Sequence, residues 1–591
     1  MSVNTERKRA PFSRGFNQYR FCKKRFSVGK ACNELLMVIW ITIVFIRRGQ
    51  MAKPVSIFGK DLQTNVRQRN KLSHLLLAMS SVIALFAFQQ AGAVEVNNDN
   101  QPQKASPVLQ SIIDAARQSA TESYEQDDHG LNSKLKEIDY TTYRSIRFKP
   151  EQSLWHGEND YELQFFHPGF LYEYPVTIHT IGESNKPERL AFNSDMFNYD
   201  GSASGLAGLT DEKSGFAGFR VHYPIKNEEY KDEFAVFLGA SYFRLVGKNQ
   251  VYGISARGLA IDTALAKGEE FPHFTEFWVI EPSEGKPITV YARLESPSVA
   301  GAYKFVIQPD IDTSVKVESW LFARDDVSKL GIAPFTSMFL YGENTEKRHD
   351  DYRPEVHDSD GVLMVTHAGE EIWRPLTNPA RLQVTSLSDA NPKGFGMLQR
   401  DGEWDNYLDA EANYHIRPGL WVTPEAGFEK GRLEVVEIPT KSEIHDNIVA
   451  FWTPEKPFNS GESLYFAYEL KTVEQNPFVS ELASVVRTRQ GKAVLPGDEF
   501  KNDSLNTTRQ FSVDFSAPSA IAFDNESMKL VVQGTNGTIS QQRLYPVADG
   551  QEWRATFFVK PKEKQTVDMR AYIEKDGKRV SEVWNYVYQP K

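Results

Sequence analysis

The sequence predicts an all-β protein, with a large N-terminal β-sandwich followed by a small C-terminal immunoglobulin-like β-sandwich. Aromatic residues make up 12% of the 591 residues, which favours strands. From about residue 140 to 470, apolar and polar residues alternate in short runs that Gly, Pro, Asn and Asp interrupt. No long helical segments alternate with these runs, so the pattern indicates antiparallel sheets and not a barrel of β/α units.

The clearest alternating runs mark the strands of the first sandwich. They cover residues 161–166, 216–223, 288–294, 303–307, 433–438 and 464–470. One helix is expected before them, because Ser106 and Pro107 form a helix start and apolar residues follow at helical spacing to Ala116.

A domain boundary is expected between residues 471 and 510, which are more polar and contain several Pro and Gly. We therefore predict a sandwich domain over 106–475, a linker over 476–510 and an immunoglobulin-like domain over 511–591. Short runs recur in this last part at 511–515, 528–532, 553–559, 567–573 and 583–588.

Residues 1–93 have the composition of a leader. They hold 16 of the 68 basic residues and only 3 of the 78 acidic ones. Basic residues precede an apolar run over 72–88, and Ala91–Ala93 fits a cleavage site, which predicts a signal peptide removed after Ala93. The alternative is an uncleaved anchor, although the run is short for a span of about 20 residues. No stable membrane insertion is expected after cleavage.

Residues 1–50 leave two interpretations open. A second apolar run at 35–46 is too short to span a membrane comfortably. Either Met51 is the true start and residues 1–50 are an over-extended reading frame, or the two runs form a double signal.

Composition and absent motifs exclude several classes of function. The excess of acidic residues after Ala93 repels nucleic acid, so no nucleic-acid partner is expected. Both cysteines, Cys22 and Cys32, lie in the leader, so the body has no disulfide, thiolate metal site or cysteine nucleophile. Glycine-rich nucleotide motifs, zinc-peptidase motifs and the serine-hydrolase elbow are absent. No cofactor and no metal are expected.

Carboxylates set among aromatic residues are the remaining chemical signal, and this combination is typical of clefts that bind sugars. It occurs at 353–360, 371–378, 414–421 and 445–452, although each segment alone also fits a turn or a capped strand edge. Arg353, Trp373, Arg374 and Trp421 are candidate sugar contacts by their chemistry, and structural roles are an equal alternative.

Several long motifs resemble one known family. They are GFAGFRVHYP at 215–224, FLGASYFR at 237–244, VYGISARGLAIDT at 251–263, EEFPHFTEFW at 269–278, TSMF at 336–339, WRPL at 373–376 and DNIVAFW at 446–452. These motifs resemble the periplasmic glucans biosynthesis protein G/D family, over essentially the whole chain after residue 106. The signal peptide favours the G type, whereas SLWH at 153–156 is similar to the D type.

The resemblance implies a fold and a function. The large sandwich would be similar to galactose mutarotase, and the protein would act in the periplasm in making osmoregulated glucans of β-1,2-linked glucose. Some members are anomer-inverting β-1,2-glucanases and related ones are transglycosylases. By the resemblance, Asp446 corresponds to the general acid, Asp358 to the general base, and Tyr414 to a tyrosine in the proton relay.

Two hypotheses follow for the activity. The first is a hydrolase or transglycosylase acting on β-1,2-glucan. The second is a non-catalytic scaffold that binds the emerging glucan for the inner-membrane glucan synthase and for branching partners, and so assists backbone release or branching.

The chemistry of the candidate residues sets further expectations. Burial beside apolar residues would keep Asp446 protonated, whereas a polar turn would keep Asp358 ionised. His357 and His445 each precede a candidate aspartate, where they either tune the carboxyl group or lie on the surface. Arg244, Arg257 and Asp262 are expected in buried ion pairs.

Overall fold

The computed structural model describes residues 105–346, 349–494 and 507–590. The predictions for the leader, including the signal peptide and the role of Met51, lie outside the described residues. Within them the all-β prediction is confirmed, because strands far outnumber helices and pair into sandwich sheets.

The first layer of the sandwich is, in the described residues, a ten-stranded sheet with the order β2-β6-β7-β8-β9-β15-β24-β23-β20 and with β10 paired to β15. Its strands are β2 (Glu162–Phe166), β6 (Gly218–Asn227), β7 (Tyr230–Leu238), β8 (Tyr242–Leu245), β9 (Ser255–Arg257), β10 (Ala260–Ile261), β15 (Leu330–Ser337), β20 (Gln383–Asp389), β23 (Gly431–Glu437) and β24 (Ile448–Pro454).

The second layer is a fifteen-stranded sheet, again counted over the described ranges, with the order β28-β31-β33-β19-β18-β21-β22-β25-β14-β13-β12-β11-β3-β4 and with β32 paired to β31. Its strands are β3 (Thr177–Ile181), β4 (Pro187–Arg189), β11 (His273–Ile280), β12 (Ile288–Glu295), β13 (Val299–Gln308), β14 (Ser314–Ala323), β18 (Gly361–Val365), β19 (Glu371–Pro375), β21 (Gly394–Leu398), β22 (Gly419–Ala426), β25 (Ser463–Val473), β28 (Met528–Gly534), β31 (Val567–Lys575), β32 (Lys578–Arg579) and β33 (Val583–Tyr588).

Aromatic side chains fill the space between the two layers. Phe219 of β6 packs edge-on against Phe277 of β11, with ring centroids 5.1 Å apart. Phe237 of β7 packs in the same way against Phe305 of β13, at 5.2 Å. The alternation seen in the sequence therefore arises because every second residue of these strands points into one shared core.

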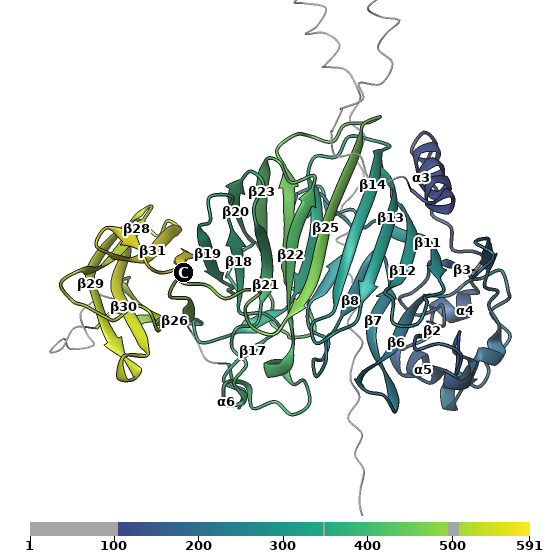
Figure 1. Cartoon of the computed structure of the whole chain (residues 1–591), viewed down its shortest axis with the longest axis horizontal. Helices are drawn as coiled ribbons and strands as arrows, with labels where there is room; N and C mark the ends of the chain where they lie inside the picture. The colour runs from purple at the N-terminus through teal and green to yellow at the C-terminus, as the bar shows by residue number, and fades with distance from the viewer. Residues whose placement is uncertain (1–104, 347–348, 495–506, 591) are drawn as a thin grey trace, which may run out of the picture. The chain divides into compact units, whose positions relative to one another are not determined.

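The predicted N-terminal helix is confirmed as α3 (Pro107–Ser119). Ser106 caps it, because its Oγ accepts a hydrogen bond from the Leu109 amide at 3.2 Å. The apolar face of α3 covers the outer side of the fifteen-stranded sheet, where β11–β14 run side by side (Figure 1). The other α-helices of the described chain are α4 (Ser133–Lys136), α5 (Tyr140–Arg144) and α6 (Trp404–Tyr407). Within the part of the chain that the structure describes, no helix is both long enough and apolar enough to cross a bilayer.

Eight further strands and a second core complete the architecture of the described residues. The remaining strands are β1 (Ile146–Phe148), β5 (Phe197–Tyr199), β16 (Phe339–Tyr341), β17 (Val356–His357), β26 (Val485–Lys492), β27 (Arg509–Ser516), β29 (Gly537–Val547) and β30 (Glu552–Pro561). β26, β27, β30 and β29 form a separate sheet, which shares a second hydrophobic core with β28, β31 and β33. β33 pairs with β19, so the fifteen-stranded sheet continues into the C-terminal strands. The division into domains at 476–510 stays a prediction.

Candidate active site

The candidate site lies at one end of four neighbouring strands of the ten-stranded sheet, β8, β9, β15 and β24. Arg244 of β8 donates Nε to Ser255 Oγ of β9 at 2.7 Å. Ser255 is paired with Thr336 of β15, and Thr336 with Val449 of β24. Asp446 lies two residues before β24 begins, so the topology brings Asp446 to the same edge as Arg244.

The position of Asp446 is fixed by the residue that follows it. Asn447 Oδ1 accepts a hydrogen bond from the Phe339 amide at 2.8 Å, and Asn447 Nδ2 donates to the Ile438 carbonyl at 2.9 Å. These two bonds tie the start of β24 to β16 on one side and to the end of β23 on the other. They fix the backbone next to Asp446 at the start of β24.

The environment of Asp446 raises the pKa of its carboxyl group. Burial raises the pKa of the Asp446 carboxyl, the negative charge of Asp358 adds to the effect, and the guanidinium groups of Arg244 and Arg417 oppose it, which gives a pKa of about 6. A carboxyl group with this pKa is still protonated in about one molecule in ten at pH 7. Asp446 therefore has the property that a general acid requires.

Asp358 stands at the end of β17 and is almost inaccessible, with 1% of its surface exposed. Its amide donates to the Met338 carbonyl at 2.8 Å, and its carboxylate forms an ion pair with Arg417. Arg417 is itself fixed, because Nε and Nη2 both donate to the Ala412 carbonyl, at 3.1 and 2.9 Å. Arg417 therefore supplies the opposite charge that a buried carboxylate requires.

Tyr414 connects Asp358 and Arg417 to a third carboxylate. It opens the short 3-10 helix Tyr414–Ile416 and is buried, and its Oη donates to Glu443 Oε2 at 2.8 Å. The Arg417 guanidinium stacks over its ring, 4.3 Å from the centroid. Burial and the nearby charge of Asp358 raise the pKa of the Tyr414 phenol far above its ordinary value, so the phenol keeps its proton.

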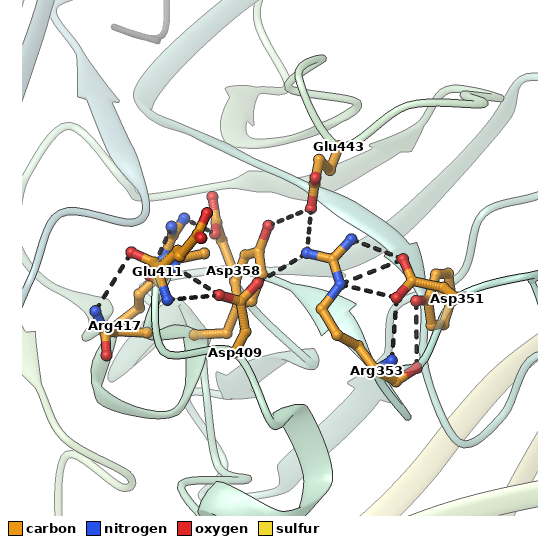
Figure 2. Close-up of polar contacts among 11 residues, drawn as sticks. Asp351, Arg353, Asp358, Asp409, Glu411, Arg417 and Glu443 are labelled. Carbon is orange, nitrogen blue, oxygen red and sulfur yellow. Dashed lines mark hydrogen bonds and ion pairs between the residues drawn. The ribbon is translucent and has the colours of Figure 1, made fainter. Parts of the chain in front are cut away.

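Arg353 extends this group into a continuous network of charges (Figure 2). Its Nη1 lies 2.8 Å from both Asp409 Oδ2 and Glu443 Oε2, and its Nη2 lies 2.7 Å from Asp351 Oδ2. Glu443 thus accepts hydrogen bonds from both Arg353 and Tyr414. The predicted residues Arg353, Asp358 and Tyr414 belong to one network, and the charge of Asp358 acts on Asp446.

The other predicted sugar contacts lie elsewhere in the structure. Trp373 of β19 and Trp421 of β22 are 4% and 8% exposed and belong to the second hydrophobic core. Each ring lies over a glycine of the neighbouring strand, because a Cβ added at Gly361 or Gly394 would fall 2.2 Å from it. Both indole rings are packed in the protein interior, and their contact with sugar stays a prediction.

Arg374 is part of a buried ion pair between the two sheets. Its Nη2 lies 2.5 Å from Glu437 Oε2, and the two side chains are 1% and 0% exposed. Gln383 and Thr377 also donate to the Glu437 carboxylate. This environment gives Arg374 a structural role, and its contact with sugar also stays a prediction.

The two histidines that precede the aspartates differ in their surroundings. His357 is fully buried, with Nε2 2.8 Å from Glu355 Oε2 and Nδ1 3.0 Å from Gln399 Oε1. The surface interpretation is therefore wrong for His357, because this polar network encloses its ring. His445 is exposed, as the surface interpretation expects.

The expected buried ion pair is present for Arg257, whereas Asp262 is paired with Lys267, whose side chain is 53% exposed. Arg257 lies 2.7 Å from Glu269, and Asp262 lies 2.7 Å from Lys267, with Arg257 and Asp262 themselves buried. The charge of Arg244 acts on Asp446.

Sequence reasoning missed three contributors to the site: Arg244, Arg417 and Glu443. Arg244 and Arg417 lie in motifs that had been singled out, whereas no pattern marked Glu443. Among the described residues, no group of three or more His, Cys, Asp or Glu side chains is arranged to hold a metal ion.

Comparison with known proteins identifies the family. Residues 108–588 match the family described as "Periplasmic glucan biosynthesis protein, MdoG". The chain therefore belongs to this family of periplasmic glucan biosynthesis proteins, and the resemblance seen in its motifs is confirmed.

The chain is similar to several glucans biosynthesis proteins G. It is 42% identical over 489 residues to that of Ralstonia nicotianae, covering 82% of this chain and 96% of the relative. It is 40% identical to that of Vibrio cholerae (80% and 86% covered) and 38% identical to that of Shewanella frigidimarina (85% and 89% covered). A galactose mutarotase related enzyme from Lactobacillus acidophilus aligns with 45% of this chain and 97% of its own, at 7% identity and a TM-score of 0.20.

Proposed function

We propose that the protein acts in the periplasm on the β-1,2-linked glucose backbone of a periplasmic glucan, as an anomer-inverting hydrolase or transglycosylase. One observation carries the proposal: the pKa of Asp446 is raised to about 6, and a second carboxyl group, that of Asp358, lies near enough for its charge to act on Asp446. Inverting cleavage of a glycosidic bond needs one protonated and one ionised carboxyl group.

Asp446 supplies the proton in the proposed reaction. The Asp446 carboxyl protonates the glycosidic oxygen while the bond between that oxygen and the anomeric carbon breaks. Water attacks the anomeric carbon from the opposite face, which inverts its configuration. A sugar hydroxyl in place of water would give transglycosylation on the same residues.

Asp358 receives the proton that water loses, by way of Tyr414. A buried base cannot touch the water directly, so the proton passes through hydroxyl groups. Because the pKa of the Tyr414 phenol lies far above its ordinary value, Tyr414 releases its proton only as it takes up another. This role requires the Tyr414 hydroxyl to turn from Glu443, its partner in the structure.

The contact between Tyr414 and Glu443 supports a second candidate function. With Tyr414 bonded to Glu443 and Asp358 paired with Arg417, the base side of the site is occupied by protein groups. A protein that kept this arrangement would bind glucan without cleaving it. It would then hold the emerging chain for the inner-membrane synthase, or for branching, as a scaffold.

Chain lengths of linear β-1,2-glucan after incubation separate these functions. The protein is compared with Asp446→Asn and Asp358→Asn, and with Asp549→Asn as an exposed control carboxylate. Shorter chains indicate a hydrolase and redistributed chains a transglycosylase, and either activity should be lost only in the first two variants. Glucan that binds and stays unchanged selects the scaffold. Equal turnover by all four proteins would contradict the assignment of both aspartates.

A further inference from the structure

The short helix α6 carries an exposed tryptophan beside the candidate site. Trp404, its first residue, has 42% of its surface exposed, and among the described residues it is the only exposed tryptophan. An indole is a large apolar group that gains free energy when it is covered. The ring of Trp404 is therefore open to a ligand, whereas Trp373 and Trp421 are buried.

Ring contacts connect Trp404 to the candidate site. Trp404 packs edge-on against His415, with ring centroids 5.1 Å apart, and His415 follows Tyr414 in the 3-10 helix. Three residues along α6, Tyr407 is buried, with its ring centroid 6.1 Å from that of Tyr414 and 5.3 Å from that of His357. These contacts place α6 next to β17 (Figure 1). Trp404 is thus the exposed member of the aromatic cluster that contains the proposed relay tyrosine.

Further apolar side chains are exposed next to residues of the charged network. Leu408 caps α6, Ile416 ends the 3-10 helix that Tyr414 opens, and Ile444 follows Glu443, and all three are exposed. Leu408 also has a φ of 54°, in the left-handed region that is unfavourable for a bulky side chain. Exposed apolar groups set among polar ones are typical of ligand-binding surfaces.

The charges beside this surface favour a neutral ligand with many hydroxyl groups. Arg353 is surrounded by three carboxylates, those of Asp351, Asp409 and Glu443, so negative charge is in excess and an anionic ligand is disfavoured. The Glu443 side chain is 36% exposed, so its carboxylate can accept a hydrogen bond from a ligand hydroxyl. A hexose combines such hydroxyl groups with an apolar face that stacks on an indole.

We propose that Trp404 is the platform on which one glucose unit of a bound glucan stacks, with Leu408 and Ile416 as apolar contacts beside it. The binding surface then extends from the proposed catalytic carboxyl groups to α6. The choice of glucose in a β-1,2-linked chain rests on the proposed function. Cleavage of the chain is not required, because the same platform would serve a hydrolase and a scaffold.

The test measures binding of linear β-1,2-glucan in protein that carries Asp446→Asn, so that the probe is not consumed. Equilibrium dialysis with radiolabelled glucan gives the Kd for this parent and for added Trp404→Ala or Trp404→Phe. Tyr545→Ala is the matched control, because Tyr545 is 39% exposed and lies on β29 of the separate C-terminal sheet. Tryptophan fluorescence with and without glucan is recorded on the same proteins.

We expect Trp404→Ala to raise the Kd about five- to ten-fold, the effect of losing one stacked ring, and Tyr545→Ala to leave it unchanged. Trp404→Phe keeps a ring and should raise the Kd less than Trp404→Ala does. Glucan should shift the emission of the parent to shorter wavelength, because the sugar shields Trp404 from water. This shift should be absent in Trp404→Phe, a difference that a merely structural role of Trp404 would not produce.

A Kd for Trp404→Ala equal to that of Tyr545→Ala, the same emission shift in Trp404→Phe as in the parent, or no glucan binding by the parent would overturn the proposal. Turnover by the wild-type protein separates this result from the proposed function. If only the proposed cleavage is wrong, the wild type gives no product, yet Trp404→Ala still weakens binding. If only the platform is wrong, the wild type cleaves glucan and Trp404→Ala binds it like the parent.

Discussion

Replacing Arg417 by alanine tests whether the charges around Asp358 act as one unit. The side chains of Arg417 and Asp358 are 9% and 2% exposed, so the variant leaves a buried carboxylate without its partner. Breaking a buried ion pair costs about 3–5 kcal/mol. The stacking of Arg417 on Tyr414, with a centroid distance of 4.3 Å, is lost as well. We expect Arg417→Ala to lower the free energy of unfolding by at least 3 kcal/mol.

Urea unfolding at pH 7 measures this loss, and a double-mutant cycle isolates the ion pair. Asp358→Asn removes the charge that Arg417→Ala would leave unpaired, so the double variant should be more stable than the sum of the single effects predicts, by about 1.5–3 kcal/mol. Additive effects, or a loss below about 1 kcal/mol for Arg417→Ala, would refute this account of the network.

Three further predictions address neighbouring groups. Burial raises the pKa of Glu343 to about 8, and the charge of Glu355 is the next largest cause. Protonated Glu343 therefore contributes to stability at low pH. This contribution declines from about pH 4.5 to pH 8, by up to about 1.4 kcal/mol per pH unit. Glu343→Gln should remove this decline in calorimetric scans between pH 5.5 and 8, and parallel curves for variant and wild type would contradict it. Tyr414→Phe should slow turnover of β-1,2-glucan at least ten-fold with binding unchanged, whereas an unchanged rate in a chromatographic assay would exclude Tyr414 from the relay. Arg374→Met should lower the thermal midpoint without changing glucan affinity in dialysis, and the reverse result would make Arg374 a sugar contact.

The fold follows from the sequence wherever burial alternates along a strand. The runs at 288–294 and 303–307 became β12 and β13, since one face of each strand packs into the common core. β29 was missed because residues Gly537–Val547 are mostly exposed and so carry no apolar alternation. β26 was missed because it lies in a polar stretch that composition alone marks as a linker.

The candidate site was predictable only in part. The motifs around Asp446, Asp358 and Tyr414 pointed to these residues through the resemblance. Their partners could not be read from the sequence, because the contact of Arg417 with Asp358 joins residues 59 positions apart, and that of Tyr414 with Glu443 joins residues 29 apart. Such contacts depend on how distant loops fold together in three dimensions.

Side-chain direction explains why two tryptophans were hard to interpret. Trp373 and Trp421 have the chemistry of sugar platforms, yet each lies on a neighbouring-strand glycine, Gly361 or Gly394, in a core shared with the C-terminal strands. The tertiary fold determines which face of a strand is covered by later parts of the chain. The local sequence pattern does not encode this.

The configuration of the first product tests the central claim, that Asp446 is the acid of an inverting cleavage. Proton NMR of the anomeric signals is recorded from the first minutes of reaction with linear β-1,2-glucan, for the protein and for Asp446→Asn. We predict that the α-anomer appears first with the protein, before mutarotation equilibrates it, and that Asp446→Asn forms no product. A β-anomer formed first, or an equal rate for Asp446→Asn, would contradict the claim.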